Sequence, residues 1–131
     1  MTEHDEQAAF VEWLEWQGIP VFAIPNGSNK SKAAAAKFKA EGLRAGVPDL
    51  MIPAPTEQYA GLFVEMKDAK NGTLSKEQKE WLSLLTDMGY ATAACWGVDE
   101  AIKCFKSYDL VGGTFQSFCR WKGGKVTPIL I

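Results

Sequence analysis

The sequence predicts one α/β domain in which a mixed central sheet is flanked by helices. The chain has 131 residues, which is the length of one ordinary domain. Its composition, with 47% hydrophobic and 23% charged residues, is typical of a folded globular protein rather than a disordered chain. Helical patterns alternate with short apolar runs, in the order helix, strand, helix, strand, strand, helix, strand, helix.

The first helix is expected over residues 3–17, because Phe10, Trp13 and Leu14 recur at helical spacing on one face. A glycine directly after this segment is a natural helix end. Residues 19–24 form a short apolar run bounded by that glycine and by a Pro-Asn-Gly sequence, which predicts a strand followed by a turn.

The next elements are a helix and two strands. Residues 29–41 combine a run of alanines with several lysines, which predicts a helix that Gly42 ends. Residues 43–47 form a glycine-containing loop, and a brief strand follows over residues 49–53. Residues 61–67 carry the clearest strand pattern in the chain.

The second half begins with a strong helix signal. Ser75 is a predicted N-cap, and Gln78 stands three residues later, as in a capping box. That helix is expected to run to about Met88. A strand over residues 90–96 and a helix over residues 98–108 complete the predicted order.

The C-terminal residues 111–131 are rich in glycine and β-forming residues, which predicts a hairpin or a short appendage. A structureless tail of this length is the less favoured choice. We therefore assign residues 1–108 to the functional domain and residues 109–131 to a C-terminal extension of the same domain.

The composition also bounds the compartment and the chemistry. No apolar run approaches the ~18 residues that cross a membrane, and the acidic N-terminus is unlike a signal or transit peptide. We therefore expect a cytoplasmic protein that does not contact membranes. The three cysteines, Cys95, Cys104 and Cys119, are widely spaced and accompany a single histidine. This inventory favours reduced cysteines that pack as small apolar residues over a disulfide or zinc site.

The net charge of −2 gives no global sign of nucleic-acid binding, but the positive charges are segregated. Residues 26–47 carry several cations against one acid, and a second group of lysines follows the clearest strand. Such segregation can present a basic face to phosphates, although ordinary solvated helix faces explain it about equally well. The cationic candidates for phosphate contacts are Lys30, Lys32, Lys37, Lys39, Arg44 and Lys76.

The candidate chemistry lies on two predicted strands. Asp49 opens the first, and Glu65 and Lys67 share one face of the second because side chains alternate along a strand. The carboxylates of Asp49 and Glu65, with the backbone carbonyl of Met66, are oxygen ligands of the kind that Mg²⁺ prefers. Lys67 could orient a water or stabilise negative charge on a phosphoryl transition state. The bland alternative is a surface ion pair between Glu65 and Lys67.

Four segments together resemble the VRR-NUC family, a branch of the PD-(D/E)xK nuclease superfamily. They are Pro25-Asn26-Gly27, Glu41-Gly42-Leu43-Arg44-Ala45-Gly46-Val47-Pro48-Asp49-Leu50, Phe63-Val64-Glu65-Met66-Lys67 and Gly72-Thr73-Leu74-Ser75-Lys76-Glu77-Gln78. The resemblance runs from about Glu3 to about residue 106. It implies a restriction-endonuclease-like core and a phosphodiesterase that uses Mg²⁺, with Mn²⁺ as a substitute.

The resemblance also implies roles for particular residues. Asp49 and Glu65 would be metal ligands, Lys67 the catalytic lysine, and Gln78 a neighbour of the site. An acid on the first helix would join them; Glu3, with Gln7 on the same helical face, fits best, and Glu6 is the rival. The turn at Asn26 lies near the site in this family, which adds a candidate contact to the DNA backbone beside its simpler structural role.

Stand-alone, phage-type members of the family resemble Holliday junction resolvases. The expected activity is therefore a DNA endonuclease that prefers branched substrates, and that acts in the host cytoplasm if a phage encodes it. A homodimer is expected, since cutting both strands of a symmetric junction needs two sites related by a two-fold axis. The alternatives are an inactive DNA-binding module of the same fold, a sequence-specific or mismatch endonuclease, and an RNA nuclease.

Overall fold

The structure, a computed structural model, describes residues 1–25, 31–110, 119–122 and 125–128. Its helices are α1 (Glu3–Trp16), α2 (Lys32–Ala40), α3 (Lys76–Asp87) and α4 (Val98–Leu110). Its strands are β1 (Phe22–Ala23), β2 (Leu50–Ile52), β3 (Leu62–Lys67), β4 (Ala91–Trp96), β5 (Cys119–Lys122) and β6 (Lys125–Pro128).

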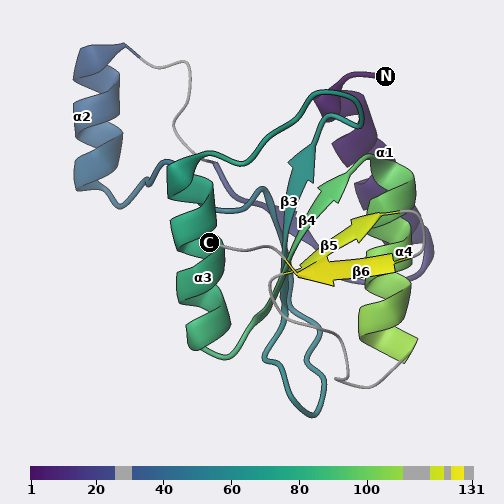
Figure 1. Cartoon of the computed structure of the whole chain (residues 1–131). Coiled ribbons are helices and arrows are strands. Elements are labelled where there is room, and N and C mark those ends of the chain that lie inside the picture. The colour runs from purple at the N-terminus through teal and green to yellow at the C-terminus, as the bar shows by residue number, and fades with distance from the viewer. Residues whose placement is uncertain (26–30, 111–118, 123–124, 129–131) are drawn as a thin grey trace.

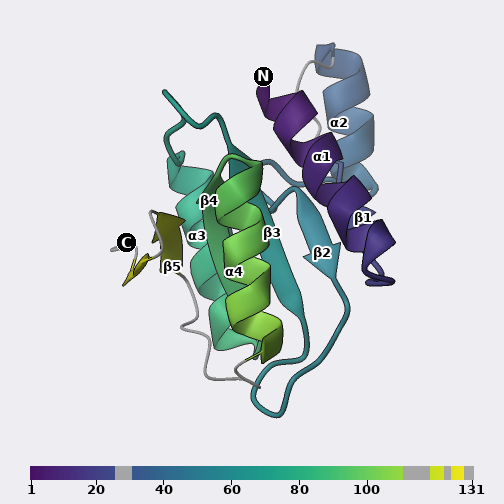
Figure 2. The same ribbon diagram turned by 90° about the vertical axis from the view of Figure 1, so that its right-hand side faces the viewer.

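Within the described residues, six strands form one sheet in the order β1-β2-β3-β4-β5-β6. The pairs β1–β2, β2–β3 and β5–β6 are antiparallel, whereas β3–β4 and β4–β5 are parallel. Helices α1 and α4 cover one face of the sheet and α3 the other, while α2 stands apart (Figures 1 and 2). The predicted α/β class, a mixed sheet flanked by helices, is confirmed.

The main apolar core lies between the sheet and helices α1 and α4. Phe10 and Leu14 of α1 are fully buried there against Val64 and Met66 of β3 and against Phe105 of α4. The first helix of the predicted order therefore forms because its apolar stripe is buried, as its spacing indicated. Burial of this stripe fixes the position of α1 over the sheet.

The opposite face of β3 carries the polar side chains. Because side chains alternate along a strand, Glu65 and Lys67 lie on the face that α3 covers. The neighbouring strand shows the same orientation, since the hydroxyl of Thr92 on β4 is hydrogen-bonded to that of Thr86 on α3 at 2.8 Å. The two charged residues of β3 lie on this face and are buried rather than displayed on the surface.

Two elements are shorter than expected. The strand predicted over residues 19–24 is limited to β1, because β2 offers it only a short partner and a proline within the segment has no N–H to donate. The helix predicted over residues 29–41 starts at Lys32, because the Ser31 hydroxyl accepts a hydrogen bond from the Ala34 N–H at 3.2 Å and caps it there.

At the C-terminus, β5 and β6 form an antiparallel pair that extends the sheet beyond β4. Of the two predicted alternatives for this region, a hairpin or a short appendage, this arrangement is the hairpin. Cys95 and Cys104 are buried in the apolar core, as expected for cysteines that pack as small apolar residues, and the side chain of Cys119 lies outside the described residues. No helix in the described part of the chain is long and apolar enough to cross a membrane.

Candidate active site

Asp49 is held at the start of β2 by contacts on both sides. Its Oδ2 accepts a hydrogen bond from the Met66 N–H of β3 at 2.7 Å. Before it, Gly46 has a φ of +87° and packs against the first turn of α3. A Cβ at this position would lie 2.6 Å from the carbonyl carbon of Glu77 and 2.9 Å from the Gln78 nitrogen. Only glycine fits at this point of the loop. The close packing against α3 fixes the path of the chain, so that the Asp49 side chain points toward β3.

Glu65 and Lys67 are buried beside Asp49, with 2% and 8% of their surfaces exposed. A surface ion pair is therefore excluded as the explanation of the Glu-x-Lys pattern. Desolvation by burial, a hydrogen bond to the Asp49 carboxyl and the Asp49 charge raise the pKa of Glu65 to about 10, and the Lys67 charge opposes them. Asp49 and Glu65 thus form a close carboxyl pair that holds a proton at neutral pH when no cation is bound.

Glu3 lies at the rim of this pair, at the first turn of α1. Burial, the Asp49 charge and the Asp68 charge raise the pKa of Glu3, while the Lys67 charge and a hydrogen bond from the Asp68 N–H lower it. These interactions place Glu3 within electrostatic reach of the buried site. They also tie the start of α1 to the residue that follows β3.

Glu6 points elsewhere. Its Oε2 accepts a hydrogen bond from the Val98 N–H at the start of α4, where a carboxylate satisfies a free helix N–H and suits the helix dipole. Of the two candidate acids on α1, the structure therefore brings Glu3 to Asp49 and Glu65 and uses Glu6 to join α1 to α4.

This division of roles predicts different outcomes for two matched substitutions. Glu6→Gln should lower the free energy of unfolding by about 1 kcal/mol, because a helix start loses a charged acceptor. Glu3→Gln should leave stability within about 0.5 kcal/mol, as exposed substitutions do. It should lower cleavage about tenfold or more by removing a charge next to the site. Chemical denaturation and single-turnover cleavage of a DNA substrate would measure both. A larger loss of stability for Glu3→Gln than for Glu6→Gln would reverse the assignment.

Gln78 lies at the third position of α3 and completes the predicted capping box. Its Oε1 accepts a hydrogen bond from the Ser75 N–H at 2.8 Å, and its own N–H donates to the Ser75 hydroxyl at 3.1 Å. The carboxamide oxygen is therefore committed to the cap. Gln78 abuts the Gly46 loop, so it supports the segment that carries Asp49.

The turn after β3 contains contributors that the sequence analysis did not single out. The Asp68 carboxylate accepts hydrogen bonds from the Lys70 and Asn71 N–H groups at 2.7 and 3.1 Å. The Gly72 carbonyl accepts one from the Trp96 indole N–H at 2.6 Å. These bonds hold the turn against β4 and position the Asp68 N–H that Glu3 uses. The Asn-Gly pair in the turn was the available signal.

The cationic candidates are distributed unevenly. Lys32 and Lys37 are exposed on α2. The Arg44 Nη1 donates hydrogen bonds to the carbonyls of Lys39 and Leu43 at 2.7 and 3.0 Å, so this guanidinium closes the C-terminal end of α2. Lys76 forms an exposed ion pair with Glu80 at 3.9 Å. Asn26 and Lys30 lie outside the described residues.

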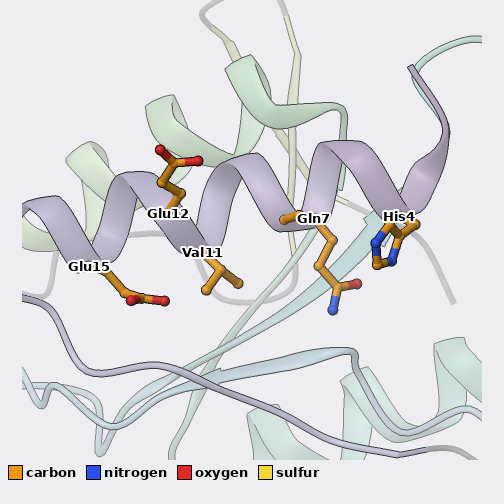
Figure 3. A pocket seen from close by; sticks show the side chains of 6 residues that line it. His4, Gln7, Val11, Glu12 and Glu15 are labelled. Atoms are coloured by element: carbon orange, nitrogen blue, oxygen red, sulfur yellow. The ribbon is translucent and has the colours of Figure 1, made fainter.

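A pocket that includes neither Asp49 nor Glu65 in its lining runs along α1 (Figure 3). It is lined by residues of this helix alone among those described: His4, Gln7, Ala8, Val11, Glu12 and Glu15. Gln7, the expected companion of Glu3, therefore faces this pocket. Its glutamates would repel phosphates, so the pocket is not a DNA site.

The donor set of the buried site suits a hard divalent cation. In the described residues, no group of three or more His, Cys, Asp or Glu side chains forms a complete metal cage. Mg²⁺ does not need one, since it commonly takes one or two carboxylates and keeps waters and substrate oxygens as its other ligands. The Asp49–Glu65 pair, which holds a proton on the side of buried Glu65, is a site where a cation could replace that proton.

Comparisons with known proteins agree with this geometry. The sequence model of the VRR-NUC domain matches residues 1–99. A solved structure described as a VRR_NUC domain protein superposes with a TM-score of 0.75 at 29% sequence identity. The match covers 86% of this chain and 92% of that one. A search of curated proteins gave no match. The family match spans Asp49, Glu65, Lys67 and Gln78, and the chain therefore belongs to the VRR-NUC domain family of nucleases.

Proposed function

We propose that this protein is a divalent-metal-dependent endonuclease that hydrolyses phosphodiester bonds of DNA. The observation that carries the proposal is the carboxyl pair of half-buried Asp49 and buried Glu65, with buried Lys67 beside it. A surface module that only binds DNA has no need to bury a glutamate and a lysine beside a second carboxylate, because desolvation of charged groups is costly. Such an arrangement is typical of a reaction centre.

The two carboxylates would hold Mg²⁺ or Mn²⁺ together with the Met66 carbonyl. Support for the carbonyl comes from strand geometry: the N–H and C=O of one strand residue lie at the same edge, and the Met66 N–H points at Asp49. When bound, the ion would supply Lewis-acid chemistry, which polarises the phosphate and acidifies a water.

The remaining groups act directly from the protein. The Lys67 ammonium, largely desolvated on the face of Glu65, can donate hydrogen bonds to a phosphate oxygen and stabilise the negative charge that develops in the transition state. Glu3, at the rim of the site, can hold a water molecule by accepting a hydrogen bond from its O–H. Gln78 keeps the Asp49 loop in register through the start of α3.

The finer parts of the proposal follow from the resemblance to stand-alone members of the family. We propose a preference for branched DNA, such as a four-way junction, and a homodimer whose two sites cut the two strands. We also count residues 109–131 with the nuclease domain, because β5 and β6 add to the same sheet. Placement in the PD-(D/E)xK superfamily follows from the Asp49, Glu65 and Lys67 pattern.

The test is cleavage of a labelled four-way junction, a flap and a linear duplex with Mg²⁺, Mn²⁺ or EDTA. Wild-type protein should cut in either metal and not in EDTA, and fastest on the junction. Asp49→Ala and Lys67→Ala should cut none of them. Salt-sensitive binding without cutting would favour the inactive DNA-binding module. Cutting of single-stranded RNA in preference to every DNA would favour the RNA nuclease.

A pH prediction follows from the raised pKa of Glu65. Between its ordinary pKa of 4.5 and about 10, the folded state holds a proton that the unfolded state releases, so rising pH favours unfolding. By pH 7 this linkage lowers the free energy of unfolding of the metal-free protein by about 3 kcal/mol, relative to pH values below the ordinary pKa. We expect the free energy of unfolding in EDTA to fall from pH 5 to pH 8, and the fall to be smaller with saturating Mg²⁺. Denaturation curves at several pH values measure it, with Glu65→Gln as control. Equal pH slopes for wild type and Glu65→Gln would contradict the assignment.

A further inference from the structure

Helix α2 differs from the other helices in having no buried residue. Helices α1, α3 and α4 each contribute fully or nearly fully buried side chains, such as Leu14, Leu82 and Phe105. Figure 1 shows α2 standing clear of the sheet, beyond α3. A helix of this length is marginal in water and is normally held by packing against the rest of the domain. Its position therefore needs an explanation other than the core.

The exposed surface of α2 is cationic. It carries Lys32, Lys37 and Lys39 and has no acid in its first turn. The ion pair found among the described residues joins Lys76 to Glu80 on α3, so it does not involve the lysines of α2. Lys32 and Lys39 are two helical turns apart and lie on one side, separated by roughly 10 Å along the axis. The half-buried Ala34 and Phe38 mark a different side.

The base of α2 is anchored next to the candidate active site. The Arg44 guanidinium donates to the Lys39 carbonyl in the last turn of the helix and to the Leu43 carbonyl in the loop that follows. Gly46, two residues after Arg44, packs against α3. Asp49 comes three residues later and accepts the hydrogen bond from the Met66 N–H. The cations of α2 are thus carried on a projecting element whose position relative to Asp49 is fixed at its root.

We propose that α2 is a second binding element for the DNA backbone, which grips phosphates away from the scissile bond. The inference rests on the proposed function and adds to it an element that contacts DNA away from the reacting bond. The occupant is a polyanion because the exposed charges of α2 are positive on a projecting helix. A second copy of the chain is the other occupant to test, since α1 carries exposed Glu12 and Glu15.

The test measures binding of the whole protein to a four-way junction and to a linear duplex in EDTA, by fluorescence anisotropy at several salt concentrations. The variant is Lys32→Gln with Lys39→Gln, which keeps helix propensity close to that of wild type. The matched control is Lys103→Gln with Lys106→Gln on α4, which removes the same charge on the other side of the sheet. Circular dichroism and thermal unfolding check that both variants fold.

We expect the α2 variant to bind the junction on the order of tenfold more weakly. Its slope of log K against log salt should be shallower by about 1.8, which is two phosphate contacts on duplex DNA. The control should stay within about twofold of wild type.

Two outcomes would overturn the inference. Equal weakening by both variants would show that only net charge matters. Unchanged DNA binding, with loss of a dimer in sedimentation of the α2 variant, would assign α2 to contacts between copies. Because binding is measured without metal, these outcomes are separate from the nuclease assignment: wild-type protein that binds through α2 and never cuts would overturn only the latter.

Discussion

Glu65→Gln is expected to abolish metal-dependent cleavage while leaving the metal-free protein at least as stable as wild type. On the proposed function, the substitution would remove one of two carboxylate ligands of the ion, and such losses lower rates by about 10³-fold or more. Stability moves the other way. A buried carboxyl whose pKa is raised to about 10 destabilises the fold at neutral pH, and a neutral amide of the same shape removes most of that cost.

The measurements are single-turnover cleavage with Mg²⁺ and chemical denaturation in EDTA at pH 7.5. The matched control is Glu100→Gln, which neutralises another buried glutamate. Glu100 lies on α4 and accepts a hydrogen bond from the Trp96 N–H at 3.2 Å. That variant should cut DNA at close to the wild-type rate and should not gain stability. A Glu65→Gln protein that still cuts within tenfold of wild type would show that Glu65 is not a ligand.

Gly46→Ala is expected to be the most damaging small substitution outside the carboxyl pair. The added Cβ would lie 2.6 Å from the Glu77 carbonyl carbon, and the φ of +87° is unfavourable for alanine. The positive φ costs an alanine about 1–2 kcal/mol, and the clash of its Cβ with the helix adds about 1–3 kcal/mol. The loop can relieve the clash only by moving away from α3, which displaces Asp49 from the Met66 N–H.

Gly42→Ala separates the two effects. Gly42 has a φ of +107° in the same loop, but a Cβ there would meet no atom within 4 Å. We expect Gly42→Ala to lose about 1 kcal/mol and to keep its cleavage rate, whereas Gly46→Ala should lose about 3 kcal/mol and most of its activity. Denaturation and single-turnover cleavage provide both numbers. Equal losses in the two variants would mean that the contact with α3 is unimportant.

Much of the fold was predictable from the sequence because its strong signals are local. The capping box at Ser75 and Gln78, the apolar stripe of Phe10 and Leu14, and the alternation around Glu65 depend on residues close in the chain. The resemblance to VRR-NUC domains then proposed roles for Asp49, Glu65 and Lys67, and the structure brings these three side chains together.

The unpredicted features depend on contacts between distant segments. Glu3 and Glu6 lie on the same helix and are both acidic, and only the position of Val98 separates their roles. Likewise, nothing local to Gly46 reveals that α3 passes close to its α-carbon. The shortening of β1 is of the same kind, since the length of an edge strand is limited by the strand beside it.

The hydrogen bond between Glu6 and Val98 joins positions 92 residues apart in the chain. Through it, the helix that presents Glu3 is seated only after β3, α3 and β4 have been made and α4 has started. A newly synthesised chain therefore lacks the complete candidate site until α4 has begun to form. On the proposed function, recovery of cleavage after dilution from denaturant would follow the docking of α1 against α4, and chains shorter than this would not cut nucleic acids.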